Sequence, residues 1–291
     1  MNLARLLVEA TVNGLLLGGS LALLALGLNL IFGVVRIVHL AYGDVLMVAM
    51  YLVYWLVAVL RWPWPLAALA TVAASSLLSA LVFAVLVRPL LRAPALNQLL
   101  ATGALSVVLQ HLALLVWGAD YRTLSIRFPV VQVGGLFLPV SRLVAFAGAL
   151  GVLAVLWLFL HRTYVGMALR AAVQDHEAAR LMGIVPQRLY LASFLLAGAV
   201  IGVVALFFSL MYPVFPDFGV PFTLYAFVIV VLGGLGNLAG TVVGALILSE
   251  VLAVVGVLVG AELSASAALV MFILVLLVRP GGVFGRVAEG R

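Results

Sequence analysis

Long apolar runs, separated by short polar segments, recur along the whole chain. A helix needs about 20 mostly apolar residues to cross a bilayer. The pattern therefore predicts an all-α fold, a polytopic membrane helical bundle with eight to nine transmembrane spans. We place the candidate spans at residues 6–32, 38–60, 65–87, 97–117, 142–161, 189–211, 222–236, 238–259 and 265–278.

Two of these runs need comment. The first, 6–32, is too long for the apolar core of a signal peptide, so we expect a span that is retained. The seventh, 222–236, is short and ends in the run Gly233-Gly234-Leu235-Gly236, which is typical of a broken or re-entrant helix. The pattern alone leaves open whether this segment crosses the membrane.

Composition agrees with a membrane protein and leaves little room for anything else. Apolar residues make up 67% of the 291 residues, charged residues 8%, and the mean hydropathy is +1.37. We therefore expect residues 1–291 to form a single transmembrane domain, with no soluble catalytic domain.

The basic residues predict the orientation. All 15 are Arg, and they are scattered between apolar runs, which is not the pattern of a nucleic-acid-binding patch. The segment 162–190 and the C-terminal tail are both rich in Arg, so we expect both on the cytoplasmic side. They share a side only if an even number of spans separates them, which favours a full crossing by 222–236. The start of the chain and the loop 118–141 are then external. The tail residues concerned are Arg279, Arg286 and Arg291.

The external loop 118–141 alternates β-branched residues and contains a Gly-Gly pair, which predicts a short hairpin or a surface helix. Its role is open between a lid over the pore mouth and a purely structural connection.

The cytoplasmic segment 162–190 contains signals for a short helix. Asp175 suits the N-cap, Gly183 suits the position after the last turn, and Pro186 prevents the helix from continuing. Leu181 and Met182, with Ala178, fall on one face. This face is suited either to lie on the bilayer or to insert into a groove of a partner protein.

Several stretches of the chain resemble one family. Residues 177–184, EAARLMGI, resemble the EAA-type loop of ABC importer permeases. Together with 163–171, this loop is similar to that of the LivH-type permeases of branched-chain amino acid importers. Members of that family usually have Asn where His39 stands. Further resemblance lies in residues 13–18, 25–33, 39–44, 231–245 and 274–284, so that it covers the chain nearly end to end.

The resemblance implies a function and a set of partners. It implies a multi-pass permease subunit of the cell inner membrane that imports branched-chain or related amino acids by alternating access. Two cytosolic ABC ATPase subunits would bind ATP and magnesium, a second LivH- or LivM-like permease subunit would complete the pore, and an extracytoplasmic amino-acid-binding protein would deliver the solute. Membrane lipid would surround the chain, which would bind no cofactor itself. The residues that would couple to the ATPases are Asp175, Glu177, Ala178, Ala179, Arg180, Leu181, Met182 and Gly183.

The residue content independently argues against an enzyme. The chain has no Lys, and therefore no phosphate-binding loop of the G-x-x-x-x-G-K-[ST] type. It also has no Cys and no cluster of His and carboxylates at metal-ligand spacing. We therefore predict no catalytic residue and no metal site.

Polar residues and glycines within the spans are the remaining candidates. Charged side chains within a bilayer are costly, so Asp44 and Glu250 are candidates for the solute pathway, or for ion coupling in a secondary transporter, which is the alternative function. Other amides and histidines, including Gln110 and His111, are more typical of interhelical hydrogen bonds. Glycines spaced four apart predict close helix packing at 14/18, 198/202, 236/240/244 and 256/260. The candidate pathway residues are Asn29, His39, Asp44, Gly233, Gly234 and Glu250.

Overall fold

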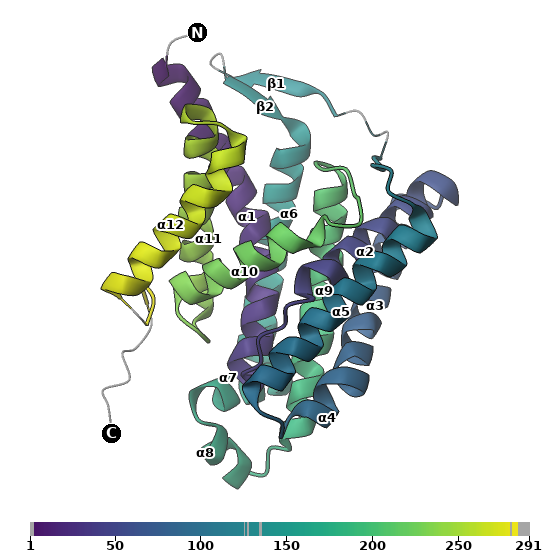
Figure 1. The fold of residues 1–291 in the computed structure, drawn as a ribbon, viewed down its shortest axis with the longest axis vertical. Helices are drawn as coiled ribbons and strands as arrows, with labels where there is room; N and C mark the ends of the chain where they lie inside the picture. Colours follow the sequence, from purple (N-terminus) through teal and green to yellow (C-terminus); the bar gives the residue numbers. More distant parts are fainter. Residues whose placement is uncertain (1–2, 125, 127, 134–135, 280, 285–291) are drawn as a thin grey trace. The chain divides into compact units, whose positions relative to one another are not determined.

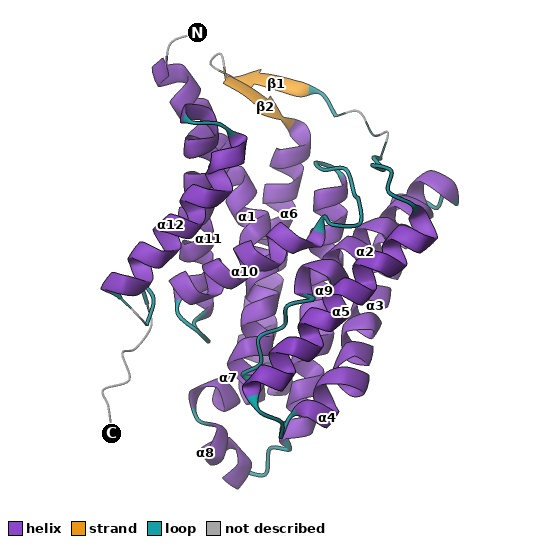
Figure 2. Cartoon of the chain, viewed as in Figure 1, coloured by secondary structure: helices purple, strands orange, loops and turns teal. Residues whose placement is uncertain are grey.

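The structure is a computed structural model that describes residues 3–124, 126, 128–133, 136–279 and 281–284. Helices dominate the described residues, with one two-stranded sheet (Figure 2). Within the described part of the chain, seven helices are long and apolar enough to cross a membrane, and two shorter apolar helices follow the sixth and the seventh. These nine correspond to the nine predicted runs, which confirms an all-α polytopic membrane bundle.

One compact unit comprises Leu30–Ser125 and Val152–Leu224. Two short π-helical segments, η1 and η2, extend α2 and α3. The sequence pattern did not predict this change of helix type, because it leaves the apolar run uninterrupted. The elements that lie within this unit are α2 (Tyr42–Tyr54), η1 (Trp55–Val59), α3 (Trp64–Val82), η2 (Phe83–Val87), α4 (Arg88–Leu90), α5 (Ala95–Trp117), α7 (Tyr164–Gln174), α8 (His176–Leu181) and α9 (Pro186–Ser209).

The other compact unit comprises Met1–Asn29, Ile126–Gly151 and Tyr225–Arg291. It holds β1 (Val130–Val133), β2 (Leu136–Pro139), α11 (Leu238–Leu258) and α12 (Ala261–Val278). The two units alternate along the chain, because three helices, which Figure 1 labels, have residues in both units. These helices are α1 (Leu3–Val35), α6 (Val140–Arg162) and α10 (Gly219–Gly233).

Close packing of α3 on α9 uses one of the predicted glycine pairs. A Cβ atom placed on Gly198 would lie 2.6 Å from Cβ of Ser79 and 2.8 Å from Cα of Ser76. One placed on Gly202 would lie 2.7 Å from Cα of Val72. Only glycine fits at both positions without movement of the α3 backbone, so the packing role predicted for this pair is confirmed.

In the unit that contains α11, glycines also allow close packing of α11 on its neighbours α1 and α10. A Cβ atom on Gly18 would lie 2.6 Å from Oγ of Ser249, and Gly240 on α11 contacts the backbone of Gly233 directly. Gly256 differs, because the nearest atom to such a Cβ is 3.9 Å away on Ser264. Close packing is therefore confirmed at Gly14, Gly18, Gly240 and Gly244, and is not seen at Gly256 or Gly260 among the described residues.

The segment 118–141 forms a hairpin, which confirms one of the two predicted alternatives. β1 and β2 pair in antiparallel register, with Val131 opposite Leu138. The Gly134-Gly135 pair lies outside the described residues, as do Arg127, Arg286 and Arg291 of the orientation argument.

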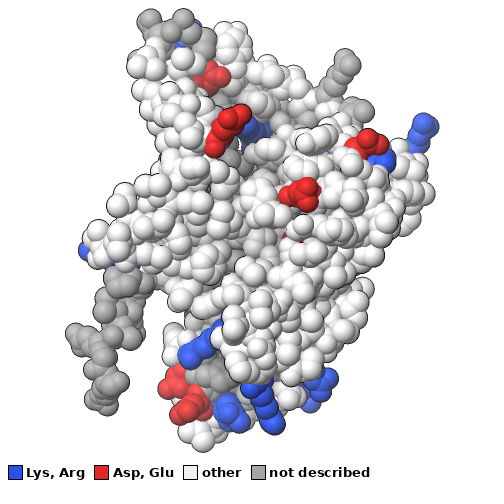
Figure 3. All heavy atoms as spheres, viewed as in Figure 1, with Lys and Arg blue, Asp and Glu red and all other residues white. Residues whose placement is uncertain are grey.

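Charged residues are unevenly distributed over the unit that contains α8. In the space-filling view, basic and acidic atoms gather over α4 and α8, whereas the sides of the neighbouring helices are almost free of charge (Figure 3). This distribution is typical of helices whose sides face lipid and whose connecting segments face water.

Candidate functional site

The short helix α8 begins at the residue that the sequence predicts. Asp175 has extended backbone angles, φ −149° and ψ 110°, and its carboxylate oxygen Oδ1 accepts hydrogen bonds from the backbone N–H groups of Glu177 at 2.9 Å and Ala178 at 3.0 Å. These are two of the N–H groups that a helix leaves without partners at its start. The N-cap prediction is therefore confirmed.

The end of α8 is equally well defined. Gly183 has φ +82°, a conformation that favours glycine. Its N–H donates to the carbonyl of Arg180 at 3.0 Å, and the N–H of Ile184 donates to the carbonyl of Ala179 at 3.2 Å. This pair of bonds is the Schellman motif. Pro186 then begins α9, as the first helical residue.

The capped helix presents apolar side chains to its surroundings. Leu181 is 88% exposed and Met182 82% exposed, and Ala178 beside them is also exposed, whereas Ala179 is buried. A six-residue helix that exposes two large apolar side chains at its end, Leu181 and the C-cap residue Met182, and whose backbone is fixed at both ends, is suited to dock against another surface.

The preceding helix α7, which contacts α8, is fastened to the end of α6. The hydroxyl of Thr163 accepts a hydrogen bond from the N–H of Gly166 at 3.1 Å, and Nε of Arg170 donates to the carbonyl of Leu160 at 2.9 Å. Gly166 lies directly on the backbone of Phe159 and Leu160. These contacts fix α7, and with it the start of α8, to the C-terminal end of α6.

Asp44 lies in the first turn of α2 and is completely buried. Its Oδ1 accepts a hydrogen bond from Nε2 of Gln110 on α5 at 3.0 Å, whereas Oδ2 has no hydrogen-bond partner. Gln110 Nε2 also donates to Oγ of Ser106 at 3.0 Å. A side-chain amide from another span thus donates to Asp44.

His39 lies in the connection between α1 and α2, outside both spanning helices. It is 1% exposed, neither ring nitrogen has a hydrogen-bond partner, and its ring contacts those of Tyr42 and Phe194. Burial lowers the pKa of His39 from 6.5 to about 4, because the charged form loses its hydration. The side chain is therefore neutral near pH 7.

Asn29 connects α1 to the break between α10 and α11. Its Nδ2 donates to Oγ1 of Thr241 at 2.6 Å and to the carbonyl of Asn237 at 3.2 Å, and its Oδ1 accepts from the N–H of Gly236 at 2.8 Å. The amide thus uses both donor hydrogens and its acceptor to fix the geometry of the break.

The break itself is built from the predicted glycine run. α10 ends at Gly233, Gly234 and Gly236 have φ values of +91° and +79°, and α11 begins at Leu238 behind the N-cap Asn237. The later segment 281–284 packs on this break: the N–H of Val283 donates to the carbonyl of Leu232 at 2.7 Å. Two motifs that are far apart in the sequence therefore form one structure.

Glu250 lies in the middle of α11, opposite α1. Its carboxylate is next to Gly14, so that a Cβ atom at that position would lie 3.1 Å from Oε1. Oε1 is buried and has no hydrogen-bond partner. The glycine therefore makes room for an acidic side chain within the helix pair.

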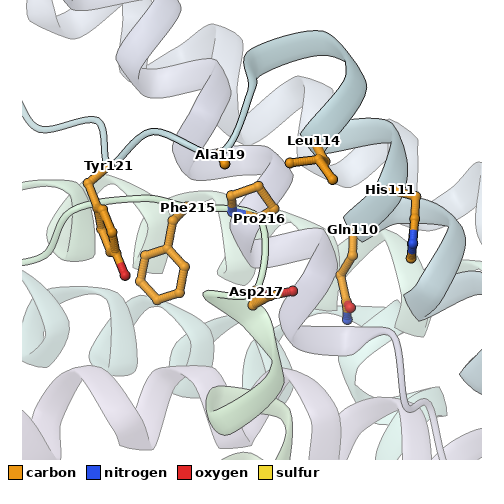
Figure 4. Close-up of a pocket in the computed structure, with 8 residues that line it drawn as sticks. All are labelled: Gln110, His111, Leu114, Ala119, Tyr121, Phe215, Pro216 and Asp217. Atoms are coloured by element: carbon orange, nitrogen blue, oxygen red, sulfur yellow. The ribbon is translucent and has the colours of Figure 1, made fainter.

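A pocket of about 260 Å³ opens where the end of α5 meets the connection between α9 and α10. Figure 4 shows the carboxylate of Asp217 directed toward the side of the pocket on which the Gln110 side chain lies. Backbone hydrogen bonds in both directions between Arg122 and Val214, at 3.0 Å and 2.9 Å, join the two connections that form it. The lining residues are Gln110, His111, Leu114, Ala119, Tyr121, Phe215, Pro216 and Asp217.

Comparison with known proteins identifies the family. Residues 10–278 match the sequence profile of the family described as "Branched-chain amino acid transport system / permease component". The chain belongs to this family. It is thus a multi-pass membrane permease component and not itself a catalytic subunit.

Named relatives of this permease agree with the family. It is 28% identical to the high-affinity branched-chain amino acid transport system permease protein BraD of Pseudomonas aeruginosa and 29% identical to LivH of Escherichia coli K12, over 96% of each chain. A probable branched-chain amino acid transport permease protein LivH of Methanocaldococcus jannaschii is 32% identical over 32% of this chain. No solved structure matches the permease.

The structure brings only some of the predicted residues together. Asn29 and the glycine run meet in one unit, and Asp44 meets Gln110 in the other. Sequence reasoning missed Asp217 altogether, although it is the only acidic residue in the connection between α9 and α10. Among the described residues, no group of three or more His, Asp or Glu is placed to hold a metal ion.

Proposed function

We propose that this permease is the transmembrane subunit of an ATP-driven importer that carries branched-chain or related amino acids across the cell inner membrane by alternating access. Family membership and the named relatives support transport of this solute class. The observation that carries the ATP-driven mechanism is α8, a helix capped at both ends with Leu181 and Met182 exposed.

The proposal requires other subunits. Two cytosolic ABC ATPases bind ATP and magnesium and receive α8, a second permease subunit of the LivH or LivM type completes the pore, and an extracytoplasmic amino-acid-binding protein delivers the solute. The coupling surface on this chain is the segment from Asp175 to Gly183. Because α7 fastens α8 to the end of α6, closure of the ATPases moves the spans and not only the loop.

The same proposal assigns the solute pathway to the broken and polar parts of the spans. The break at Gly233 and Gly234 interrupts the helical hydrogen-bond pattern within a predicted span, as the discontinuous helices at transport sites do. Asn29 holds that break, and His39, Asp44 and Glu250 supply polar side chains within or beside the spans.

A test uses labelled L-leucine and proteoliposomes that contain the permease with its co-purifying subunits. We expect ATP-driven uptake to fall about tenfold or more in a variant with both Leu181→Ser and Met182→Ser, because apolar anchors dominate docking energies. Val185→Ser is the matched control, since Val185 is a half-exposed apolar residue just outside α8. Uptake that needs no ATP, or that is equal in both variants, would contradict the coupling role.

One observation favours a second function, ion-coupled secondary transport. Asp44 is fully buried with Oδ2 unpartnered, as a residue that takes up a proton or sodium ion would be. In that case leucine uptake would follow an imposed ion gradient without ATP, would fail in Asp44→Asn, and would be unaffected by the α8 variants.

A further inference from the structure

The pocket beside α5 contains polar groups that the proposed function does not assign. Its wall is polar on one side, with Gln110, His111 and Asp217, and largely apolar elsewhere, with Leu114, Tyr121 and Phe215 among the lining residues (Figure 4). All of these residues belong to the same compact unit. With about 260 Å³, the pocket is larger than engineered cavities of roughly 150 Å³ that hold benzene.

The hydrogen-bond pattern shows which kind of group fits the polar side. Both hydrogens of Gln110 Nε2 are used, one by Asp44 Oδ1 and one by Ser106 Oγ. The orientation of the amide follows, because the Asp44 carboxylate needs a donor. Gln110 therefore offers a ligand only its acceptor, Oε1. Asp217 adds a carboxylate, and the pocket wall contains no Arg.

A second observation points to a cation. Asp44 lies directly behind Gln110, is 0% exposed, and has one carboxylate oxygen without any partner. A buried carboxylate with one oxygen that lacks a hydrogen-bond partner is costly, and a cation in the pocket relieves this cost.

The apolar wall selects among cations. Tyr121 and Phe215 contact each other, with ring centroids 4.8 Å apart, and Pro216 and Leu114 extend the same surface. A small hydrated metal ion gains nothing from such a surface, whereas an alkyl chain is removed from water there. The ligand that matches both sides is a primary ammonium group attached to a short aliphatic chain.

We propose that this pocket is an amino-acid-binding site of the permease, in which Asp217 and Oε1 of Gln110 receive the ammonium group, Asp44 stabilises its charge from behind, and Leu114, Tyr121 and Phe215 contact the aliphatic side chain. This inference rests on the proposed function and adds to it the part of the solute that is recognised. On the predicted orientation, the pocket opens on the external side, where the binding protein releases its cargo.

Binding is measured on the purified permease with its co-purifying subunits and without the binding protein, from the thermal midpoint as a function of ligand concentration. The probes are L-leucine, isoamylamine, which lacks the carboxylate, and 4-methylpentanoate, which lacks the ammonium group. We expect the first two to raise the midpoint and the third to have no effect. The reverse order, or no response to leucine, would overturn the inference.

Variants then assign the binding to this pocket. We expect Asp217→Asn to weaken leucine binding about tenfold, the effect of removing one charge-assisted hydrogen bond. Asp120→Asn is the matched control, because Asp120 is an exposed acid in the neighbouring connection that does not line the pocket. Asp217 is itself exposed, so its variant should fold normally; equal affinities in both variants would refute the assignment.

The variant Asp44→Asn provides an independent test of the proposed ammonium site. A leucine affinity reduced by a similar factor supports the role of Asp44 behind Gln110, whereas a sodium-dependent midpoint shift that is lost in this variant would replace the ammonium site by an ion site. ATP-driven uptake by the wild type is measured in parallel. If uptake is present while leucine binding is absent, only this inference fails; if uptake is absent, the proposed function fails.

Discussion

Asn29 and Asp44 are both buried polar residues of the permease, but their surroundings differ. The Asn29 amide uses its donors and its acceptor within the break between α10 and α11. Asp44 keeps one oxygen without a partner. Since an unsatisfied buried acceptor costs roughly 1–3 kcal/mol, Asn29 is explained by structure alone, whereas Asp44 calls for a ligand or a proton.

Residue-level prediction from the sequence succeeded where the interaction is local. The caps of α8 depend on residues within five positions of each other, so Asp175 and Gly183 were recognisable from spacing alone. The bond between Gln110 and Asp44 joins residues 66 positions apart and depends on how α2 packs on α5. No local pattern contains that information, and Asp217 was missed for the same reason.

His39 makes stability depend on pH. Its pKa is 6.5 in an unfolded chain and about 4 in the folded protein, so between these values the unfolded state takes up a proton that the folded state does not. Stability from this residue is complete above about pH 6.5 and is lost as the pH falls toward 4. At pH 5 the loss is about 2 kcal/mol.

Thermal midpoints in detergent at pH 7.5 and pH 5.0 provide the check. We expect the acid-induced drop to be smaller in His39→Asn than in the wild type, because the variant has no ring to protonate. His111→Asn serves as the control, since His111 is exposed. An equal drop in all three proteins would show that His39 is protonated without cost.

At the scale of elements, the apolar pattern predicts where the spans lie, but not the residues at which the helices within and between them begin and end. The pattern placed the seventh span at 222–236, whereas α10 runs from Gly219 to Gly233. Its end is set by the positive φ of Gly234 and by the segment 281–284 that packs on it. α7 was not predicted as a separate helix, because the division from α6 depends on the Thr163 cap.

Alanine substitutions at Gly198 and Gly151 test how closely α3 packs on α9. Both lie within spanning helices, but a Cβ atom on Gly198 would collide with α3, while one on Gly151 has no neighbour within 4 Å. We expect Gly198→Ala to lower stability by about 1–3 kcal/mol through overpacking. Gly151→Ala should be neutral or stabilising by up to about 1 kcal/mol, since Ala is the better helix former.

Both effects are measured from thermal midpoints. Each purified variant is heated to a series of temperatures, and the folded fraction that remains is determined by size-exclusion chromatography. Ser79→Gly in the Gly198→Ala background should restore part of the loss, because Cβ of Ser79 is one of the atoms in the way. Equal midpoints for the two glycine variants would mean that α3 and α9 are not closely packed in the protein.

At the scale of the whole molecule, the chain folds into two interleaved units, which the sequence did not suggest. The prediction that residues 1–291 form a single permease domain rests on uniform hydropathy and stays a prediction, because hydropathy does not record which spans contact each other. Helices α1, α6 and α10 each have residues in both units, and the sequence pattern does not indicate where the division falls within them. Whether α10 crosses the membrane decides on which side the C-terminal segment lies.

Labelling of single cysteines answers that question directly, because the natural chain has no Cys and needs no background substitutions. We expect a membrane-impermeant maleimide applied to intact cells to label Asp120→Cys and not Met182→Cys or Phe284→Cys; after permeabilisation all three should react. All three side chains are exposed, so a lack of reaction in intact cells reports the membrane barrier. If Phe284→Cys were labelled together with Asp120→Cys, α10 would be re-entrant, and the Arg-rich tail would lie opposite α8.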